Sequence, residues 1–343
     1  MYFALTDDQR EFGAAVRGYL ADRFDLDAVR AVVEERDTVP GAREGHPGTL
    51  WKAAAEQGWT AVLVPEEHDG LGLGMVDAQV IARALGAGLA PGPWRGTVLA
   101  AEAFRLAGSP AQQASWLPRL AAGDVVGACT LRGAAPGTLP AVEYGGLADV
   151  IIARSGAGLA VVERTAATPR AGYDGTVRLA DVEVTAGEAL PGADAAAVAE
   201  LTARGTVLVA ADLVGLAREA LTRTVAYDRD RQQFGVPVGS FQAIKHALAD
   251  LHVAVTLAEH AVLYAAHALD AGLDDVELAV AVAKAKAGDA ALGTTAAMIQ
   301  YHGGIGYTWE HEAHLFYKRA KRLAGQFGTT AAHRARIAEL TIG

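Results

Sequence analysis

Apolar residues recur at helical spacing near the start of the chain. Leu5, Phe12, Val16 and Leu20 are separated by four or seven residues, which places them on one face of a helix. Thr6, followed three residues later by Gln9, has the pattern of a helix N-cap. Further helices are predicted near residues 77–89 and 111–120, and the glycine-rich run 65–74 is predicted to be a loop. Residues 1–122 are therefore predicted to form an N-terminal helical domain.

The pattern changes between residues 123 and 194. Short runs rich in Val, Ile and Thr stand between Gly and Pro residues, as is typical of strands and turns. They cover residues 125–130, 150–153, 159–162 and 176–179. We expect a small antiparallel β domain over residues 123–194.

From residue 195 the helical period returns over longer runs. One predicted helix has an apolar face from Val207 to Val225, and others have faces from Ile244 to Val262 and from Leu278 to Ala290. Many alanines and few charges allow such helices to pack closely. Residues 195–343 are therefore predicted to form a C-terminal four-helix bundle. The predicted fold is mainly α with a small β domain.

Composition and charge narrow the possible functions. The 343 residues include 51% hydrophobic and 20% charged residues, and the net charge is −10. This balance is typical of a globular protein and argues against nucleic-acid binding, which needs a basic face. The single Cys129 excludes an internal disulfide, and no apolar run is long enough to span a membrane. Without a secretory signal at the start, a cytoplasmic location is expected.

Two segments of the predicted bundle carry candidate chemistry. One contains Arg231, Gln233, Phe234 and Gly235, followed by Phe241 and Gln242; the other contains Gln300, Gly303, Gly304 and Gly306. A guanidinium binds two phosphate oxygens at once. An aromatic ring offers a flat apolar wall, and glutamine amides reach polar edges. Adjacent glycines let backbone N–H groups approach a phosphate closely. Together these residue types predict a site for a pyrophosphate and an adenine.

In this order and spacing the two segments resemble motifs of the acyl-CoA dehydrogenase family of flavoproteins. The resemblance extends to Gly58, Trp59 and the run 64–67 near the start of the chain. It implies an acyl-CoA dehydrogenase fold, FAD as cofactor, an acyl-CoA substrate and an electron-transfer flavoprotein as electron acceptor. In the family these motifs contact the ADP half of a flavin that the neighbouring subunit mainly holds. The cofactor-binding residues implied here are Arg231, Gln233, Phe234, Gln242, Gln300, Gly303 and Gly304.

The middle of the chain departs from that family. Of the residue types that contact the flavin ring in the family, only Thr130 is retained, and a strand within residues 141–150 is expected to be shortened or lost. Where the family carries its glutamate base this chain has Phe327, and at the alternative family position it has Gly205. Neither residue can accept a proton. We therefore expect no catalytic residue in this chain.

This combination is similar to the non-catalytic subunits of heteromeric bacterial acyl-CoA dehydrogenases that act on steroid side chains. It implies a heterotetramer in which a homologous subunit carries the base and grips the flavin ring. The implied reaction is α,β-desaturation of an acyl-CoA thioester. Two alternatives stay open: a self-sufficient homomeric enzyme with an unaligned base, and a cofactor-free helical assembly subunit. Glu200 and Asp212 lie nearest the vacant base position, and we expect neither to replace the base.

Other polar clusters have simpler interpretations. The run Glu310 to His314 invites a metal interpretation but lacks the HExxH frame, so no metal site is expected. Lys318, Arg319, Lys321 and Arg322 are expected to form a solvated helix face. Cys129 is expected to be a small buried residue.

Overall fold

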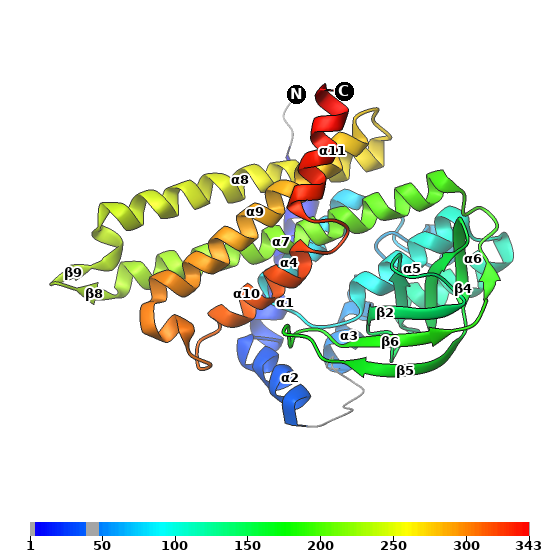
Figure 1. Ribbon diagram of the computed structural model, residues 1–343, viewed down its shortest axis with the longest axis horizontal. Coiled ribbons are helices and arrows are strands. Elements are labelled where there is room, and N and C mark those ends of the chain that lie inside the picture. The colour runs from blue at the N-terminus through cyan, green and yellow to red at the C-terminus, as the bar shows by residue number, and fades with distance from the viewer. Residues whose placement is uncertain (1–3, 39–47, 343) are drawn as a thin grey trace. The chain divides into compact units, whose positions relative to one another are not determined.

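The computed structural model describes residues 4–38 and 48–342, with helices first, strands in the middle and longer helices after them (Figure 1). The N-terminal helices are α1 (Asp7–Arg23), α2 (Leu26–Thr38), α3 (Gly48–Glu56), η1 (Glu66–His68), α4 (Met75–Ala87), α5 (Trp94–Ala107) and α6 (Pro110–Ala121). The strands of the middle region are β1 (Gly127–Thr130), β2 (Gly137–Glu143), β3 (Val150–Ser155), β4 (Gly158–Val162), β5 (Arg164–Arg170), β6 (Leu179–Val184) and β7 (Glu188–Ala189). The C-terminal elements are α7 (Ala195–Asp230), β8 (Gln232–Gln233), β9 (Val236–Pro237), η2 (Val238–Ser240), α8 (Gln242–Ala271), α9 (Val276–His302), η3 (Gly303–Tyr307), α10 (Ala313–Ala324) and α11 (Thr330–Ile342). The predicted fold class, mainly α with a small β domain, is confirmed.

The predicted cap at the start of α1 is a capping box, in which Thr6 and Gln9 exchange two hydrogen bonds. The Thr6 hydroxyl accepts from the Gln9 N–H at 3.2 Å, and the Gln9 side chain accepts from the Thr6 N–H at 3.1 Å. The helices predicted near 77–89 and 111–120 correspond to α4 and α6. Helix α5 was not predicted, because ten of its fourteen residues are buried and the unbroken buried run 97–104 hides the helical period.

The strands of the middle region, β1 to β7, form two small sheets, with orders β1-β3-β4-β7 and β2-β6-β5. The expectation of an antiparallel domain is wrong for one pair, since β1 and β3 run parallel. The reason is topological: the chain between them passes through β2, which belongs to the other sheet. Apolar residues from both sheets, including Leu139, Val182 and Ile151, form one buried cluster.

The strand predicted at residues 176–179 is also wrong, because β6 begins only at Leu179. Strand β5 was missed since all seven of its residues are exposed and show no alternation of apolar and polar types.

In the C-terminal bundle α9 packs against α8, α10 and α11. Helix α7 crosses α4 at very short range, which requires glycine. A Cβ at Gly215 would lie 1.9 Å from the Arg83 carbonyl oxygen, and one at Gly86 would lie 2.1 Å from the Asp212 carbonyl oxygen. These two positions let backbone pack on backbone. None of the helices in the described ranges is long and apolar enough to cross a membrane.

The chain forms two compact units that do not coincide with the sequence order of the elements. One, here called the helical unit, comprises Met1–Leu26, Gln79–Ala90 and Thr206–Gly343. The other, here called the mixed unit, comprises Asp27–Ala78 and Pro91–Gly205. The division into domains at 122 and 194 therefore remains a prediction.

Candidate functional site

The first candidate segment is a tight hairpin at the end of α7. Strands β8 and β9 pair antiparallel, and the two residues between them, Phe234 and Gly235, have φ of 55° and 79°. Two consecutive positive φ values are typical of a type I′ turn, whose twist suits a two-residue hairpin. The Arg231 N–H donates to the Tyr227 carbonyl and the Val238 N–H donates to the Arg231 carbonyl, both at 2.8 Å. Arg231 is thus fixed where the helix becomes the hairpin.

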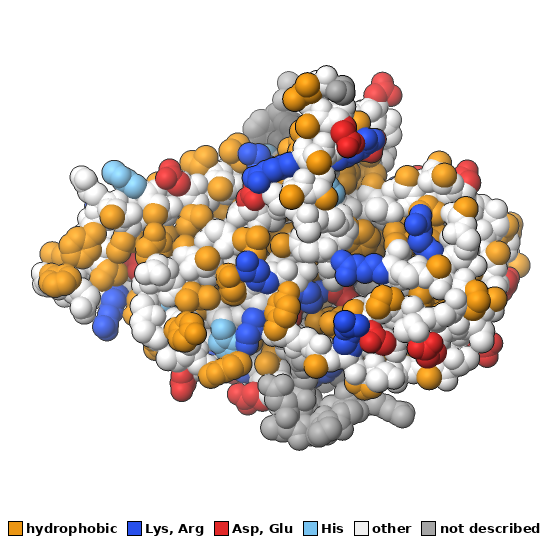
Figure 2. Space-filling view, in the orientation of Figure 1, with side chains coloured by type: hydrophobic (Ala, Val, Ile, Leu, Met, Phe, Trp, Pro, Cys, Tyr) orange, Lys and Arg blue, Asp and Glu red, His pale blue; other side chains and the backbone are white. Residues whose placement is uncertain are grey.

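The side chains of this hairpin face outward. Phe234 is 93% exposed, and its ring contacts Phe241 edge-on with centroids 6.3 Å apart. Arg231 is exposed, and within the described residues its side chain has neither an ion pair nor a hydrogen bond. Figure 2 shows hydrophobic side chains gathered at the tip where Figure 1 places β8 and β9. An exposed aromatic ring beside an unpaired guanidinium is typical of a binding surface.

The second candidate segment is the end of α9. Gln300 is exposed, and Gly303 has φ 65° and ψ −140°, a conformation that favours glycine. No atom lies within 4 Å of a Cβ built at Gly303 or at Gly304. Both backbone positions are therefore open to an approaching ligand, whereas Gly306 lies close to the Ile299 carbonyl and serves packing.

An aromatic stack joins the two segments. The rings of Tyr227 and His302 are 4.2 Å apart, and the Tyr227 hydroxyl donates to the His302 carbonyl at 3.4 Å. His302 also contacts His311, with ring centroids 4.4 Å apart. Burial lowers the pKa of His302, so its ring is neutral near pH 7. Because Tyr227 lies in the last turn of α7 and His302 ends α9, the hairpin and the glycine pair lie at the same end of the bundle (Figure 1).

We call this end the clamp and define it by Arg231, Gln233, Phe234, Gln242, Gln300, Gly303 and Gly304. Gln242 is the first residue of α8, next to Phe241, and is exposed. The Gln233 amide donates only to its neighbour Gln232, at 2.8 Å. The donors available are one guanidinium and three amide side chains, and they lie at the same end of the bundle as the open backbone at Gly303 and Gly304, where the Gly303 N–H donates to the Gln300 carbonyl. This set fits a diphosphate with an attached aromatic ring.

Buried and half-buried side chains donate hydrogen bonds to the backbone of the loop that carries Phe327. Lys284 is fully buried, and its ammonium donates to the carbonyls of Ala324 and Gly328 at 3.1 and 3.0 Å. The His333 ring donates to the Phe327 carbonyl at 2.8 Å. Phe327 itself has φ 51°, an uncommon conformation for a residue with a Cβ. Burial lowers the pKa of Lys284 to about 8.

The acids nearest the vacant base position already have partners. Asp212 and Arg319 are each 6% exposed and are joined by two contacts, at 2.8 and 3.1 Å. In the mixed unit, Glu200 accepts from Arg204 at 2.8 Å. Both carboxylates are therefore already engaged by guanidinium groups.

The pairing of Arg319 corrects the expectation of a wholly solvated helix face, because Arg319 is buried and also donates to the Ala90 carbonyl at 3.0 Å. The isolated Asp212 within an apolar helix was the signal that a buried partner was required.

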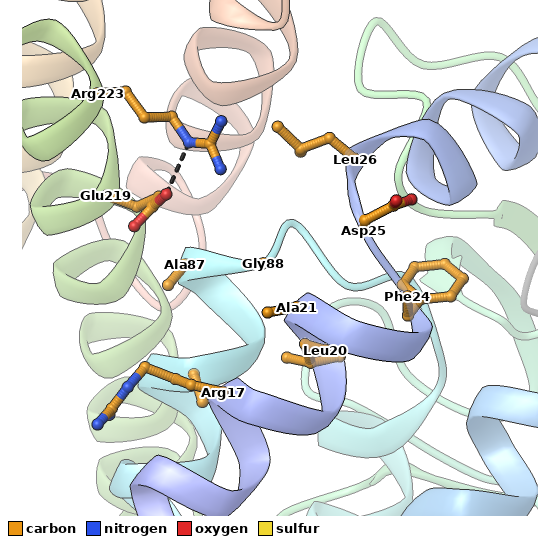
Figure 3. A pocket seen from close by; sticks show the side chains of 11 residues that line it. Arg17, Leu20, Ala21, Phe24, Asp25, Leu26, Ala87, Gly88, Glu219 and Arg223 are labelled. Carbon is orange, nitrogen blue, oxygen red and sulfur yellow. Dashed lines mark hydrogen bonds and ion pairs between the residues drawn. The ribbon is translucent and has the colours of Figure 1, made fainter. Parts of the chain in front are cut away.

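One pocket of about 300 Å³ lies within the helical unit, between α1, α4 and α7 (Figure 3). Apolar residues such as Leu20, Phe24 and Leu26 line it, and Arg223 faces it from α7. Arg223 is already engaged, since it donates to Glu219 at 2.7 Å and to Glu312 at 3.2 Å. The pocket contains none of the clamp residues.

Comparison with known proteins gives two family matches that together cover most of the chain. Residues 6–124 match the family described as acyl-CoA dehydrogenase, N-terminal domain, and residues 195–341 match acyl-CoA dehydrogenase, C-terminal domain. Acyl-CoA dehydrogenase IpdE2 of Mycobacterium tuberculosis is 38% identical over 80% of this chain and 81% of its own length. The chain belongs to the acyl-CoA dehydrogenase family.

Two solved structures share the fold over nearly the full length. A chain of the ChsE4-ChsE5 complex from Mycobacterium tuberculosis is 25% identical, with a TM-score of 0.88, and covers 99% of this chain and 98% of that one. A chain of the Tcur3481-Tcur3483 steroid ACAD, G363A variant, is 25% identical, with a TM-score of 0.86, and covers 98% of each chain. The first of these relatives is a complex of two named proteins, and the second is described as a steroid enzyme.

Proposed function

We propose that this chain is a subunit of a heteromeric, FAD-dependent acyl-CoA dehydrogenase that desaturates an acyl-CoA thioester between its α and β carbons. Its part would be to clamp the ADP half of an FAD that a homologous subunit holds, without supplying the base. The observation that carries the proposal is the outward-facing clamp, in which Arg231 has no partner within the described residues. Its likeness to a steroid acyl-CoA dehydrogenase supports a steroid-derived acyl group as the first substrate to test.

When bound, FAD would supply the hydride acceptor. Arg231 would bind pyrophosphate oxygens through two parallel N–H bonds, and the backbone at Gly303 and Gly304 would approach the same phosphates. Phe234 would cover an aromatic face, and Gln242 and Gln300 would reach polar edges of the ligand. Electrons would pass on to an electron-transfer flavoprotein.

The test of the clamp is Arg231→Ala in the complex assembled with the partner subunit. Loss of a charge-assisted contact, worth about 1.5–3 kcal/mol, should speed FAD dissociation by roughly 10- to 100-fold. Arg231→Lys should restore only part of the retention, because an ammonium cannot make the bidentate contact. Arg229→Ala is the matched control, since Arg229 is 78% exposed and lies two residues away. An unchanged dissociation rate for Arg231→Ala would refute the clamp.

The expectation that this chain lacks the base has its own test. Glu200→Gln should leave flavin reduction by acyl-CoA within about threefold, far less than the 10²–10⁴-fold that a general base contributes. A loss beyond a hundredfold, with FAD content intact, would favour the self-sufficient enzyme. Asp212 is unsuitable for this test because its substitution would break a buried ion pair.

The visible absorption spectrum separates the alternatives. Purified alone, the chain should be colourless, because the ring-binding residue types are missing from its middle region. With its partner it should carry FAD. Stoichiometric flavin in the single chain would favour the homomeric enzyme, and flavin in neither preparation would favour the cofactor-free assembly subunit.

A further inference from the structure

A buried carboxylate lies directly beside the clamp, and it has no hydrogen-bond partner among the described residues. Asp228 belongs to the last turn of α7, three residues before Arg231, and is 0% exposed. Neither of its carboxylate oxygens has a hydrogen-bond partner within the described residues. Asp212, by contrast, is paired with Arg319. A buried acceptor without a donor is unfavourable and requires an explanation.

The element packed on Asp228 leads into the start of α8. A Cβ built at Gly239 in η2 would lie 3.0 Å from the Asp228 carbonyl oxygen and 3.4 Å from its Cβ. Two residues after Gly239, Phe241 occupies the N-cap of α8 and provides no side-chain cap. The N–H groups of Gln242 and Ala243 have no protein acceptor among the described residues. A helix N-terminus carries partial positive charge and favours a carboxylate. A buried acceptor and an uncapped helix start are therefore separated only by η2.

We infer that Asp228 is a positioning residue of the clamp, whose carboxylate accepts backbone N–H groups of the η2–α8 turn when the clamp closes on its ligand. This contact would hold the Gln242 end of α8 against the helix that carries Arg231. The inference rests on the proposed function of the clamp. It explains why a carboxylate is buried here and why Gly239 has no side chain, since a Cβ would keep η2 away from α7.

The surrounding charges do not provide an alternative partner. The ionisable groups on the neighbouring elements are Tyr227, Arg229, Asp230 and Arg231 at the end of α7, Lys245 and His246 in the first turns of α8, and Tyr301 and His302 at the end of α9; η2 has none. Burial alone raises the pKa of Asp228 to about 6. N–H groups arriving at the carboxylate would lower that pKa again, so ligand binding should release a proton near pH 6. FAD retention should therefore strengthen as the pH rises through about 6.

The experiment compares wild type, Asp228→Asn and Arg231→Ala in the assembled complex. Asparagine is nearly isosteric, cannot ionise and is a weaker acceptor for N–H groups. We expect Asp228→Asn to speed FAD dissociation about 3- to 10-fold at pH 7.5 and to flatten its pH dependence between about 5 and 7. The melting temperature should not fall. Asp230→Asn is the matched control, since Asp230 is 78% exposed.

A second readout is amide hydrogen exchange over residues 238–245. FAD should slow exchange there in the wild type and much less in Asp228→Asn. If Arg231→Ala loses FAD faster while Asp228→Asn behaves as wild type in both rate and exchange, the positioning role is wrong and the clamp stands. If neither variant changes the dissociation rate, the clamp itself is wrong and this inference is overturned with it.

Discussion

Two regions of the helical unit differ in whether their polar side chains have partners. In the middle of the unit, Arg319 and Asp212 are buried and paired at 2.8 Å, and the buried Lys284 donates to two carbonyls. At the clamp, Arg231 is exposed and Asp228 is buried, and neither side chain has a partner within the described residues. Polar groups that are buried and satisfied hold the fold together. We propose that groups left unsatisfied at the clamp are completed by another molecule.

The comparison predicts its largest stability effect at the buried pair. Arg319→Ala leaves Asp212 buried and unpaired, which should lower the free energy of unfolding by about 3–5 kcal/mol. Chemical denaturation of the variant and the wild type measures this change in the free energy of unfolding. Lys318→Ala is the control: its ammonium lies over the exposed Trp309 ring at 4.1 Å, and losing that contact should change stability by less than about 1 kcal/mol. Equal effects for the two variants would contradict the distinction between the regions.

The next effect concerns Lys284, whose pKa is lowered to about 8 from an ordinary 10.5. Unfolding therefore takes up a proton between these values, so wild-type stability should rise as the pH goes from about 8 to about 10.5. Lys284→Met should remove that rise. It should also cost roughly 1–3 kcal/mol near pH 7, because the Ala324 and Gly328 carbonyls lose their donor. Denaturation curves across the pH range test both points, and an unchanged slope would mean that Lys284 is not the group responsible.

The stability contributed by Asp228 should change with pH in the opposite direction to that of Lys284. Its pKa is raised to about 6 from an ordinary 3.8, so folding takes up a proton and stability falls as the pH rises between these values. Asp228→Asn should remove this fall and stabilise the free chain by about 1–2 kcal/mol above pH 6. A variant less stable than wild type at pH 7.5 would show that the carboxylate already has a stabilising partner in the free chain.

The smallest stability effect is expected at the clamp surface. Phe234 is 93% exposed, so Phe234→Ser should change the free energy of unfolding by less than about 0.5 kcal/mol. FAD retention in the complex should nevertheless fall by roughly 2- to 10-fold, as expected when one aromatic contact is lost. A large loss of stability without any change in retention would place Phe234 with the structural residues.

Much of the fold was predictable because local patterns report it directly. The Thr6 cap, helices α4 and α6, and the long bundle helices follow from capping chemistry and helical spacing. Strand β5 and helix α5 were missed, because a fully exposed strand and a helix with an unbroken buried run over residues 97–104 both lack the alternation of apolar and polar residues on which such predictions depend.

The sequence by itself determined the residue types of the clamp and the absence of an ionisable group at positions 205 and 327, since both depend on side-chain chemistry and order along the chain. Only the tertiary structure decided which charged side chains form ion pairs with each other. It buried Arg319 against Asp212, 107 residues away, and it brought the ends of α7 and α9 together through Tyr227 and His302. It also left the Asp228 carboxylate buried, with no hydrogen-bond partner among the described residues. These outcomes depend on burial and on contacts between distant residues, and a linear sequence does not specify either one.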